Sequence, residues 1–380
     1  MRVYLDNAAT TPISKEVLEV MIPVMQDQYG NPSSIHADGR KIRSIIEEAR
    51  KTVANHIGAS IGEIFFTSGG TESNNMALKC AVRDLGVTRI ISSKLEHHCI
   101  LHCLESADLF DKVSVEYAEF DANGNIKLPA LEQLIKSSDK KTLVSLMHAN
   151  NEIGSKLNFE AVSKLCADKG AYFHSDSVQT MGHFPINVND YKISFLSGSA
   201  HKFHGPKGSG FIYINGDNII KPYIEGGAQE RNMRAGTENV YGIVGLAKAF
   251  DLACNHMEER ANHIKKVRSY LMTRLKNEFD DILFNGPEEG GLYTVLSVSF
   301  PPNEKSSLLL IQLDMAGISA SGGSACSSGA DVGSHVLQAL GVDPSRKTIR
   351  FSFSHYNTIE EIDFLIEKLK TIIPSKEIAV

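Results

Sequence analysis

The chain has 380 residues, of which 42% are hydrophobic, and its 39 lysines and arginines against 45 aspartates and glutamates give a formal net charge of −6. At about 150 residues per domain, this length allows two domains that can each bury a core without cross-links. The slightly acidic balance and the lack of a long basic block disfavour nucleic acid as a partner. No apolar stretch approaches the roughly 20 residues that cross a bilayer, so we expect no membrane segment.

The first residues and the cysteines indicate the cellular compartment that we expect for the protein. Residues 1–6 (MRVYLD) have the features of neither a signal peptide nor a transit peptide. None of the six cysteines forms a C-x-x-C pair, which favours free thiols in a reducing compartment over a disulfide framework or a zinc module. We therefore expect a cytoplasmic protein.

The first strong helix signal spans residues 40–57, where apolar residues recur on one helix face and Gly58 follows as a C-terminal cap. Residues 63–67 (EIFFT) then predict a strand, residues 68–71 a glycine turn and residues 76–82 a helix. This order of strand, turn and helix is one crossover unit of a parallel sheet.

Strands and helices continue to alternate through the middle of the chain. Apolar and β-branched runs predict strands at residues 89–92, 113–118, 142–148, 171–174 and 193–197, with a helix at 159–169. This alternation indicates an α/β fold with a mostly parallel sheet. Polar side chains follow several of these strands, and since parallel strands end at one edge of the sheet, we expect one shared cleft there.

The character of the sequence changes near residue 255. Long charged helical segments begin there, followed by a β-rich run at residues 294–300 and a final helix that a capping box opens. The sequence therefore predicts a large domain and a smaller α+β domain that carries Cys326. Their predicted ranges are 15–254 for the large domain, and 1–14 with 255–380 for the small one.

Two residues that follow predicted strands suggest cofactor chemistry. Lys202 lies in a tight, glycine-flanked loop, which suits a Schiff-base lysine because such an amine must be held rigidly and partly desolvated. Taken alone, it is more often a solvated surface lysine. Asp176 ends an apolar strand, where a carboxylate needs a cationic partner such as a protonated pyridine nitrogen. A helix N-cap explains Asp176 equally well.

Two further segments have more than one interpretation. The run SGGTESNN at residues 68–75 offers N–H groups and hydroxyls at a helix start, which suits a phosphate monoester, although an ordinary turn is an equal explanation. Histidines and cysteines between residues 97 and 103 have helical spacing, but a zinc site would need further ligands, so we expect no metal. A single imidazole, His97, is favoured as an acid–base catalyst beside Lys202.

Cys326 lies in ASGGSACSSG at residues 320–329, a run so rich in small residues that we expect an exposed, mobile loop. A thiolate on such a loop can enter a cleft, take up a group and carry it to an acceptor. The alternative is a plain linker in which the cysteine is incidental.

Together, the ordered motifs resemble the cysteine desulfurases of the class V aminotransferase group, which are pyridoxal-phosphate enzymes of fold type I. The motifs are YLDNAATTP at 4–12, GNPSS at 30–34, TSGGTESNN at 67–75, EHH at 96–98, NNEIG at 150–154, SGGSACSSG at 321–329, and Arg350. The resemblance covers nearly the whole chain, and it implies a seven-stranded, mostly parallel sheet in the large domain.

The activity that the resemblance implies is conversion of L-cysteine to L-alanine by a homodimer, with the sulfur left as a persulfide on Cys326. The persulfide would serve iron–sulfur cluster assembly and other thiolation pathways. The loop composition is similar to that of the iron–sulfur-housekeeping and nitrogenase-associated branch, which suggests direct transfer to a scaffold protein. The alternatives are a selenocysteine lyase, a β-lyase of another sulfur amino acid, and a non-catalytic protein in which Cys326 is only an oxidisable thiol.

The resemblance also implies a role for each site residue by its position in the motifs. Around pyridoxal phosphate, Lys202 would form the Schiff base, Asp176 would pair with the pyridine nitrogen, Gln179 with the phenolic oxygen, and His97 would stack on the ring and transfer protons. The phosphate would be held by Gly70, Thr71, Ser199 and His201, and by Thr237 of the other subunit. The substrate carboxylate would be bound by Arg350 and Asn151, the latter also contacting the cofactor, and Cys326 would attack the substrate sulfur. The chain departs from the family at Gly70, usually alanine or valine, and at Cys99, commonly alanine.

Overall fold

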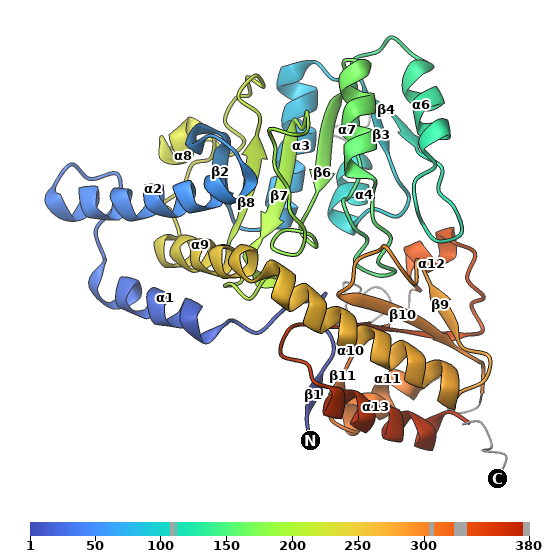
Figure 1. The fold of residues 1–380 in the computed structure, drawn as a ribbon. Coiled ribbons are helices and arrows are strands. Elements are labelled where there is room, and N and C mark those ends of the chain that lie inside the picture. Colours follow the sequence, from blue (N-terminus) through green and yellow to red (C-terminus); the bar gives the residue numbers. More distant parts are fainter. Residues whose placement is uncertain (107–110, 112, 304–307, 323–332, 375–380) are drawn as a thin grey trace.

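The computed structural model describes residues 1–106, 111, 113–303, 308–322 and 333–374. A large sheet flanked by helices fills one part of the molecule, and a smaller group of strands and helices from the C-terminal third lies beside it (Figure 1). The chain's first residues join this smaller group. Cys326 lies outside the described residues, so the expectations about its loop concern a segment without a structural description.

The large sheet has seven strands in the order β2-β8-β7-β6-β5-β3-β4. Their bounds are Ile64–Thr67 (β2), Arg89–Ser92 (β3), Ser114–Tyr117 (β4), Thr142–Ser145 (β5), Tyr172–Asp176 (β6), Phe195–Ser199 (β7) and Gly210–Ile214 (β8). All neighbouring pairs are parallel except those of β8, which runs antiparallel to β2 and β7. The predicted α/β fold with a mostly parallel seven-stranded sheet is confirmed.

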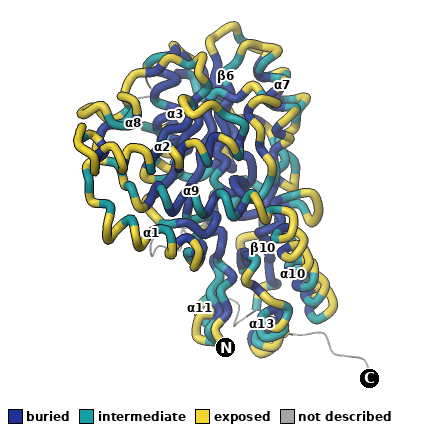
Figure 2. The backbone as a smooth tube through the Cα atoms, turned by 60° about the vertical axis from the view of Figure 1, so that its left-hand side comes forward, coloured by how far each residue is buried: buried dark blue, intermediate teal, exposed yellow. Residues whose placement is uncertain are grey.

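Helices cover both faces of this sheet. They are Lys15–Asp27 (α1), Ala37–Ile57 (α2), Gly70–Leu85 (α3), His98–Leu104 (α4), Leu128–Lys136 (α6), Phe159–Asp168 (α7), Gln229–Asn232 (α8) and Val240–Asn255 (α9). Alternate residues of a strand join different cores: Phe65 packs with residues of α3 and α4, whereas Phe66 packs with residues of α2 and α9. Figure 2 shows the result, a buried sheet within exposed outer turns. The period of two therefore produces a sheet that is buried on both faces.

Several predicted elements differ from the structure at their ends. Helix α2 begins at Ala37 rather than at residue 40, because His36 already caps the backbone N–H of Gly39, and it ends at the expected glycine, Gly58, with a φ of 69°. The strand predicted at residues 142–148 stops at Ser145. Beyond it, Leu146 and His148 still donate backbone N–H groups to residues of β6, and the chain then turns back, with the N–H of Leu157 bonded to the carbonyl of His148. This turn places residues 149–152 beside the sheet's carboxyl edge.

The second group of elements surrounds a separate apolar core. Its strands are Val3–Tyr4 (β1), Leu283–Asn285 (β9), Val295–Phe300 (β10), Ile318–Ser319 (β11) and Lys347–Ser352 (β12), and its helices are Met257–Glu278 (α10), Leu309–Met315 (α11) and Ile359–Ile372 (α13). Helix α12, His335–Ala339, instead packs through Val336 with Leu95 and Ile153. Strands β9, β10 and β12 form an antiparallel sheet, while β1 pairs with β11 in parallel. The predicted capping box is present at Thr358. Among the described helices, none is long and apolar enough to cross a bilayer.

Candidate active site

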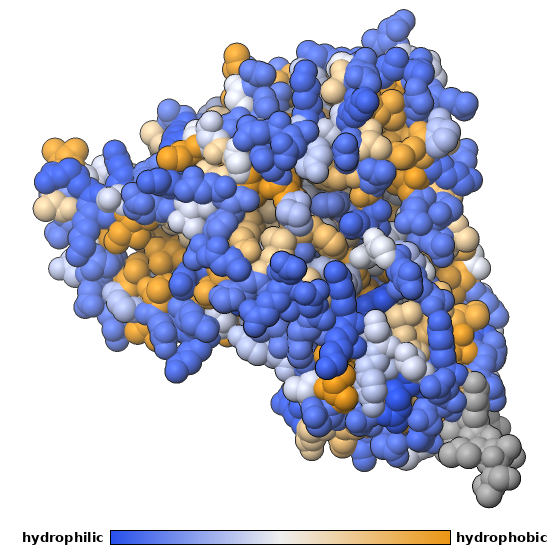
Figure 3. Space-filling view, in the orientation of Figure 1, coloured by the Kyte–Doolittle hydropathy of each residue, from blue (hydrophilic) through white to orange (hydrophobic). Residues whose placement is uncertain are grey.

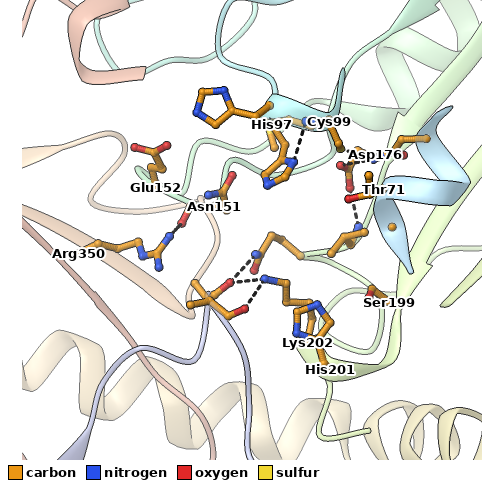
Figure 4. Close-up of a pocket in the computed structure, with 18 of the residues that line it drawn as sticks. Thr71, His97, Cys99, Asn151, Glu152, Asp176, Ser199, His201, Lys202 and Arg350 are labelled. Carbon is orange, nitrogen blue, oxygen red and sulfur yellow. Dashed lines mark hydrogen bonds between the residues drawn. The ribbon is translucent and has the colours of Figure 1, made fainter. Parts of the chain in front are cut away.

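A cavity of about 320 Å³ opens at the carboxyl ends of β5, β6 and β7, where polar side chains converge (Figure 4). Ten of the residues predicted from the sequence line it: Gly70, Thr71, His97, Asn151, Asp176, Gln179, Ser199, His201, Lys202 and Arg350. Two are not among its lining residues, because Thr237 lies exposed elsewhere on this chain and Cys326 is outside the described residues. The expected clustering at one edge of the parallel sheet is therefore observed.

Lys202 is held by the backbone of the N-terminal segment. It ends a short 3₁₀ turn, Ala200–Lys202, directly after β7. Its Nζ donates to the carbonyl oxygens of Ala8 at 2.6 Å and Ala9 at 2.8 Å, and Gln179 Nε2 donates to the same Ala8 oxygen at 3.0 Å. Because two fixed acceptors bind the amine, its head group stays at the cavity wall (Figure 4).

Asp176 receives a chain of hydrogen bonds that ends on its carboxylate. Asn74 Nδ2 donates to Asp176 Oδ2 at 2.7 Å, and His174 Nε2 in turn donates to Asn74 Oδ1 at 3.2 Å. Burial lowers the pKa of His174 to about 3, so its ring is neutral, and Nδ1 accepts from the Ser145 hydroxyl at 2.9 Å. Every donor in this chain points toward the carboxylate, so the network fixes the orientation of the Asp176 side chain.

His97 occupies the N-cap of α4 and faces the cavity. Its Nδ1 accepts the backbone N–H of Cys99 at 3.1 Å, so the proton of the neutral ring resides on Nε2. Burial lowers the pKa of His97, the charge of Asp176 opposes this shift, and Lys202 adds to it. The ring is therefore fixed in orientation and tautomer, with Nε2 as the nitrogen that exchanges a proton.

Small and hydroxyl-bearing residues gather where the start of α3 and the end of β7 meet at the cavity. Helix α3 begins at Gly70, and the first N–H groups of a helix have no partner within it. A Cβ at Gly70 would lie 2.5 Å from Val178 Cγ2, so glycine keeps this corner open. Ser199 and His201 approach from the end of β7, and burial together with Lys202 lowers the pKa of His201 to about 4. The corner thus combines neutral donors with a helix N-terminus, which suits an anion.

Arg350 lies on β12 at the border between the two cores. Its side chain is only 1% exposed, yet it lines the cavity. The Nη1 atom donates to the carbonyl oxygen of Asn151 at 3.0 Å, and Nη2 lies 2.9 Å from Asp6 Oδ1. A buried, oriented guanidinium of this kind matches a carboxylate ligand.

Both described flanks of the segment that contains Cys326 contact residues that line this cavity. On one side, Ser321 pairs with Arg350 through two backbone hydrogen bonds. On the other, the Ser334 hydroxyl donates to Glu152, and His335 Nε2 donates to the carbonyl oxygen of Glu96 at 2.9 Å. Glu152 and His335 themselves line the cavity.

The histidines near α4 stack instead of converging on an ion. The ring of His98 lies 5.0 Å from that of His102 and 4.4 Å from that of His335, measured between centroids. In the part of the chain that the structure describes, no group of three or more histidine, cysteine or acidic side chains could hold a metal.

Some lining residues had been given no role at the site from the sequence. They are Ala8, Ala9, Asn74, His98, Cys99, Met147, Glu152, Val178 and His335. Asn74 and Glu152 belong to the quoted motifs at 67–75 and 150–154, so their position beside Thr71 and Asn151 was an available signal. Ala8 and Ala9 contribute carbonyl oxygens, which no side-chain pattern indicates.

Comparison with known proteins identifies the family of this chain. The family model for aminotransferase class-V matches residues 3–365. A cysteine desulfurase IscS of Dictyoglomus turgidum is 44% identical and the alignment covers 99% of this chain and 97% of that protein.

Solved structures are similar over almost the full chain as well. A NifS-like protein is 40% identical with a TM-score of 0.90, covering 98% of this chain and 99% of its own. SspA in complex with cysteine is 31% identical with a TM-score of 0.81, covering 94% of this chain and 100% of its own. The chain belongs to the class-V aminotransferase family, within its group of cysteine desulfurases.

Proposed function

We propose that this protein is a pyridoxal-phosphate-dependent cysteine desulfurase that converts L-cysteine to L-alanine and retains the sulfur as a persulfide on Cys326. One observation carries the proposal: a single cavity joins Lys202, the Asp176 carboxylate and the buried Arg350 guanidinium to both described flanks of the Cys326 segment. In the overall reaction, the Cβ–S bond of the substrate breaks and a disulfide-type S–S bond forms at Cys326. L-Cysteine and one thiol thus yield L-alanine and one persulfide, and no outside oxidant is needed.

The donor set of the cavity fits pyridoxal phosphate. The corner that Gly70 keeps open, with the α3 N-terminus, Thr71, Ser199 and His201, would take the phosphate. Asp176, whose carboxyl is oriented by hydrogen bonds from Asn74 and the backbone of Val178, would pair with the pyridinium nitrogen. Lys202 would hold the aldehyde, Gln179 the phenolic oxygen, and His97 the ring face. When bound, the cofactor supplies an electron sink for a negative charge at the substrate Cα.

The chain's own groups perform the remaining tasks. Arg350 would bind the substrate carboxylate, with Asn151 beside it, which orients the amino acid toward Lys202. His97 offers Nε2 for proton transfer, since its Nδ1 is committed to the Cys99 amide. Lys202 is the second group that can take or return a proton, and the carbonyl oxygens of Ala8 and Ala9 hold its Nζ at the wall. Cys326 would supply the nucleophile that receives the sulfur.

We propose that the protein acts as a homodimer. Apolar side chains are exposed along α1 and the segment that follows it: Leu18, Ile22, Met25, Tyr29 and Ile35, the last at 90% exposure. Figure 3 shows apolar surface gathered beside α1 and α2. Burial of this surface by a second copy would remove a large apolar patch from water. It would also allow Thr237, which is exposed here, to reach the phosphate of the other subunit's site.

The wider setting follows from the same proposal. A persulfide on Cys326 would be passed to an iron–sulfur scaffold or another acceptor protein. The described cysteines are all free, which supports a reducing, cytoplasmic location. Within the chain, residues 15–254 would form the cofactor-binding domain, and residues 1–14 with 255–380 the smaller domain that carries Cys326. The apolar cores on either side of residue 255 support this division.

The decisive experiment incubates the purified holoprotein with L-cysteine and a reductant, and measures alanine and sulfide together. We expect equal amounts of both from the wild type, and neither from Cys326→Ala, which should keep the visible colour of its cofactor. Lys202→Ala should lose both the colour and the activity. Undiminished activity of Cys326→Ala would refute the persulfide role and favour a lyase for another substrate.

A further inference from the structure

We infer that Asp6 is the positioning residue for the carboxylate receptor: it holds the Arg350 guanidinium in the orientation that binds the amino-acid substrate. The inference rests on the proposed function and deepens it, because it names a group outside the cavity that sets the affinity for the substrate carboxylate. Asp6 and Ser321 are absent from the lining of the cavity, whereas Arg350 is part of it.

The backbone places Asp6 at the meeting point of three segments. Residue 6 follows β1 and forms a parallel bridge with Ser352 at the end of β12. Next to it, Ser321 forms an antiparallel bridge with Arg350 and donates its hydroxyl to Asp6 Oδ1 at 2.7 Å. The same oxygen accepts from Arg350 Nη2 at 2.9 Å. Two donors from two different segments therefore fix one carboxylate oxygen.

Arg350 depends on this carboxylate because it is almost entirely buried. Its side chain is 1% exposed, while that of Asp6 is 19% exposed, and a buried cation without a counter-charge is costly. Among the described residues, the other acceptor of its side chain is the carbonyl oxygen of Asn151, which takes a hydrogen bond from Nη1, and Nε has no partner. Asp6 is thus the ion-pair partner of Arg350 in the described structure.

The number of N–H groups on the Arg350 guanidinium is sufficient for one further carboxylate ligand. Each terminal nitrogen of a guanidinium carries two N–H groups. In Arg350, one group of Nη1 is bonded to Asn151 and one of Nη2 to Asp6, so each nitrogen retains one donor that no described residue accepts. Two N–H groups are the number that a carboxylate accepts in a bidentate pair. Without Asp6, the guanidinium would lose one of its two described hydrogen bonds, and the two remaining N–H groups would no longer be held in one orientation.

The test compares two ligands that differ only in the carboxylate. L-Alanine is the product of the proposed reaction, and ethylamine is the same molecule without its carboxylate. Their binding to the holoprotein is measured by calorimetry for the wild type, Asp6→Asn, Ser321→Ala and the control Asp217→Asn, which changes an exposed aspartate in the turn after β8. Asp6→Asn is nearly isosteric, and Ser321→Ala provides a milder perturbation of the same carboxylate.

For Asp6→Asn, we expect the affinity for L-alanine to fall about tenfold or more, as the loss of a charge-assisted hydrogen bond predicts, while ethylamine binds as in the wild type. Ser321→Ala should show a smaller loss of the same kind, and Asp217→Asn none. In turnover of L-cysteine, Asp6→Asn should raise KM and change kcat less. An unchanged L-alanine affinity in Asp6→Asn, or an equal loss for both ligands, would overturn the inference. If the wild type itself neither binds L-alanine nor turns over L-cysteine, the proposed function fails instead.

Discussion

Glu96 offers the sharpest electrostatic prediction, because its carboxyl is buried without a cation among the described residues near it. The side chain precedes His97 and is 1% exposed. Its Oε1 accepts the backbone N–H of Met147 at 2.8 Å, and Oε2 has no hydrogen-bond partner within the described ranges. Burial raises the pKa of Glu96 well above the usual range, and the charge of Asp176 adds to this shift. The protein should therefore become more stable when this carboxyl is replaced by a neutral amide, Glu96→Gln.

The pH dependence of this gain has a defined sign. A raised pKa means that the folded state keeps a proton that the unfolded state has released, so stability falls as pH rises above the unfolded carboxyl pKa of about 4.3. The fall is about 1.4 kcal/mol per pH unit until the pH reaches the folded-state pKa, and it then levels off. Below the unfolded pKa, glutamate and glutamine both enter the core uncharged. The advantage of Glu96→Gln should thus be small near pH 4 and grow as the pH rises.

Urea unfolding followed by circular dichroism at a series of pH values from 5 to 8 provides the measurement. Glu48→Gln serves as the matched control, since Glu48 is an exposed glutamate on α2 and its replacement should not produce a pH-dependent difference of this size. A stability difference between Glu96→Gln and the wild type that stays constant across this range would refute the reasoning.

Two further perturbations test the site and the fold. Asn74→Ala removes the hydrogen bond to Asp176 Oδ2, and since such bonds to charged groups are worth about 1.5–3 kcal/mol, we expect kcat/KM for L-cysteine to fall about 10- to 100-fold in steady-state alanine assays. Arg50 and Glu230 form a bidentate pair with side chains 2% and 3% exposed. Arg50→Met should cost about 3–5 kcal/mol in urea unfolding, and Arg50→Met with Glu230→Leu should recover much of this loss, because only the single change leaves a buried charge unpaired.

The site residues that could be predicted from the sequence are those whose side-chain type and position at the end of a strand are visible in it. Asp176 is the last residue of a strand, and Lys202 and His97 lie in the segments that follow one, so parallel strands bring all three to one edge. Strand β8 was not predicted, because the glycines of residues 205–210 indicate a loop up to its first residue. Glycine is needed there for a close approach, since a Cβ at Gly210 would lie 2.6 Å from Gly69 Cα. The apolar run FIYI that follows was an available signal, as the similar run of β2 was.

Other features depend on tertiary contacts that no local pattern encodes. The strand predicted at residues 142–148 ends at Ser145, yet Leu146 and His148 still bond to β6 before the chain turns back and pairs with residues 155–157. The donors that fix Asp176 come from α3 and β6, which are far apart in the sequence. The ion pair between Asp6 and Arg350 joins residues separated by 344 positions. Each requires the folded arrangement before it can be recognised.

The N-terminal segment explains how the two halves of the cavity keep their spacing. Asp6 binds Arg350 at the receptor for the substrate carboxylate. Two residues later, Ala8 and then Ala9 bind the Lys202 amine. One continuous stretch of backbone therefore contacts both the carboxylate receptor and the lysine, and covalent geometry fixes the separation between those contacts. Because these anchors lie on one segment, a shift of one core against the other must strain bonds at Asp6 or at Ala8 before it can separate the guanidinium from the amine.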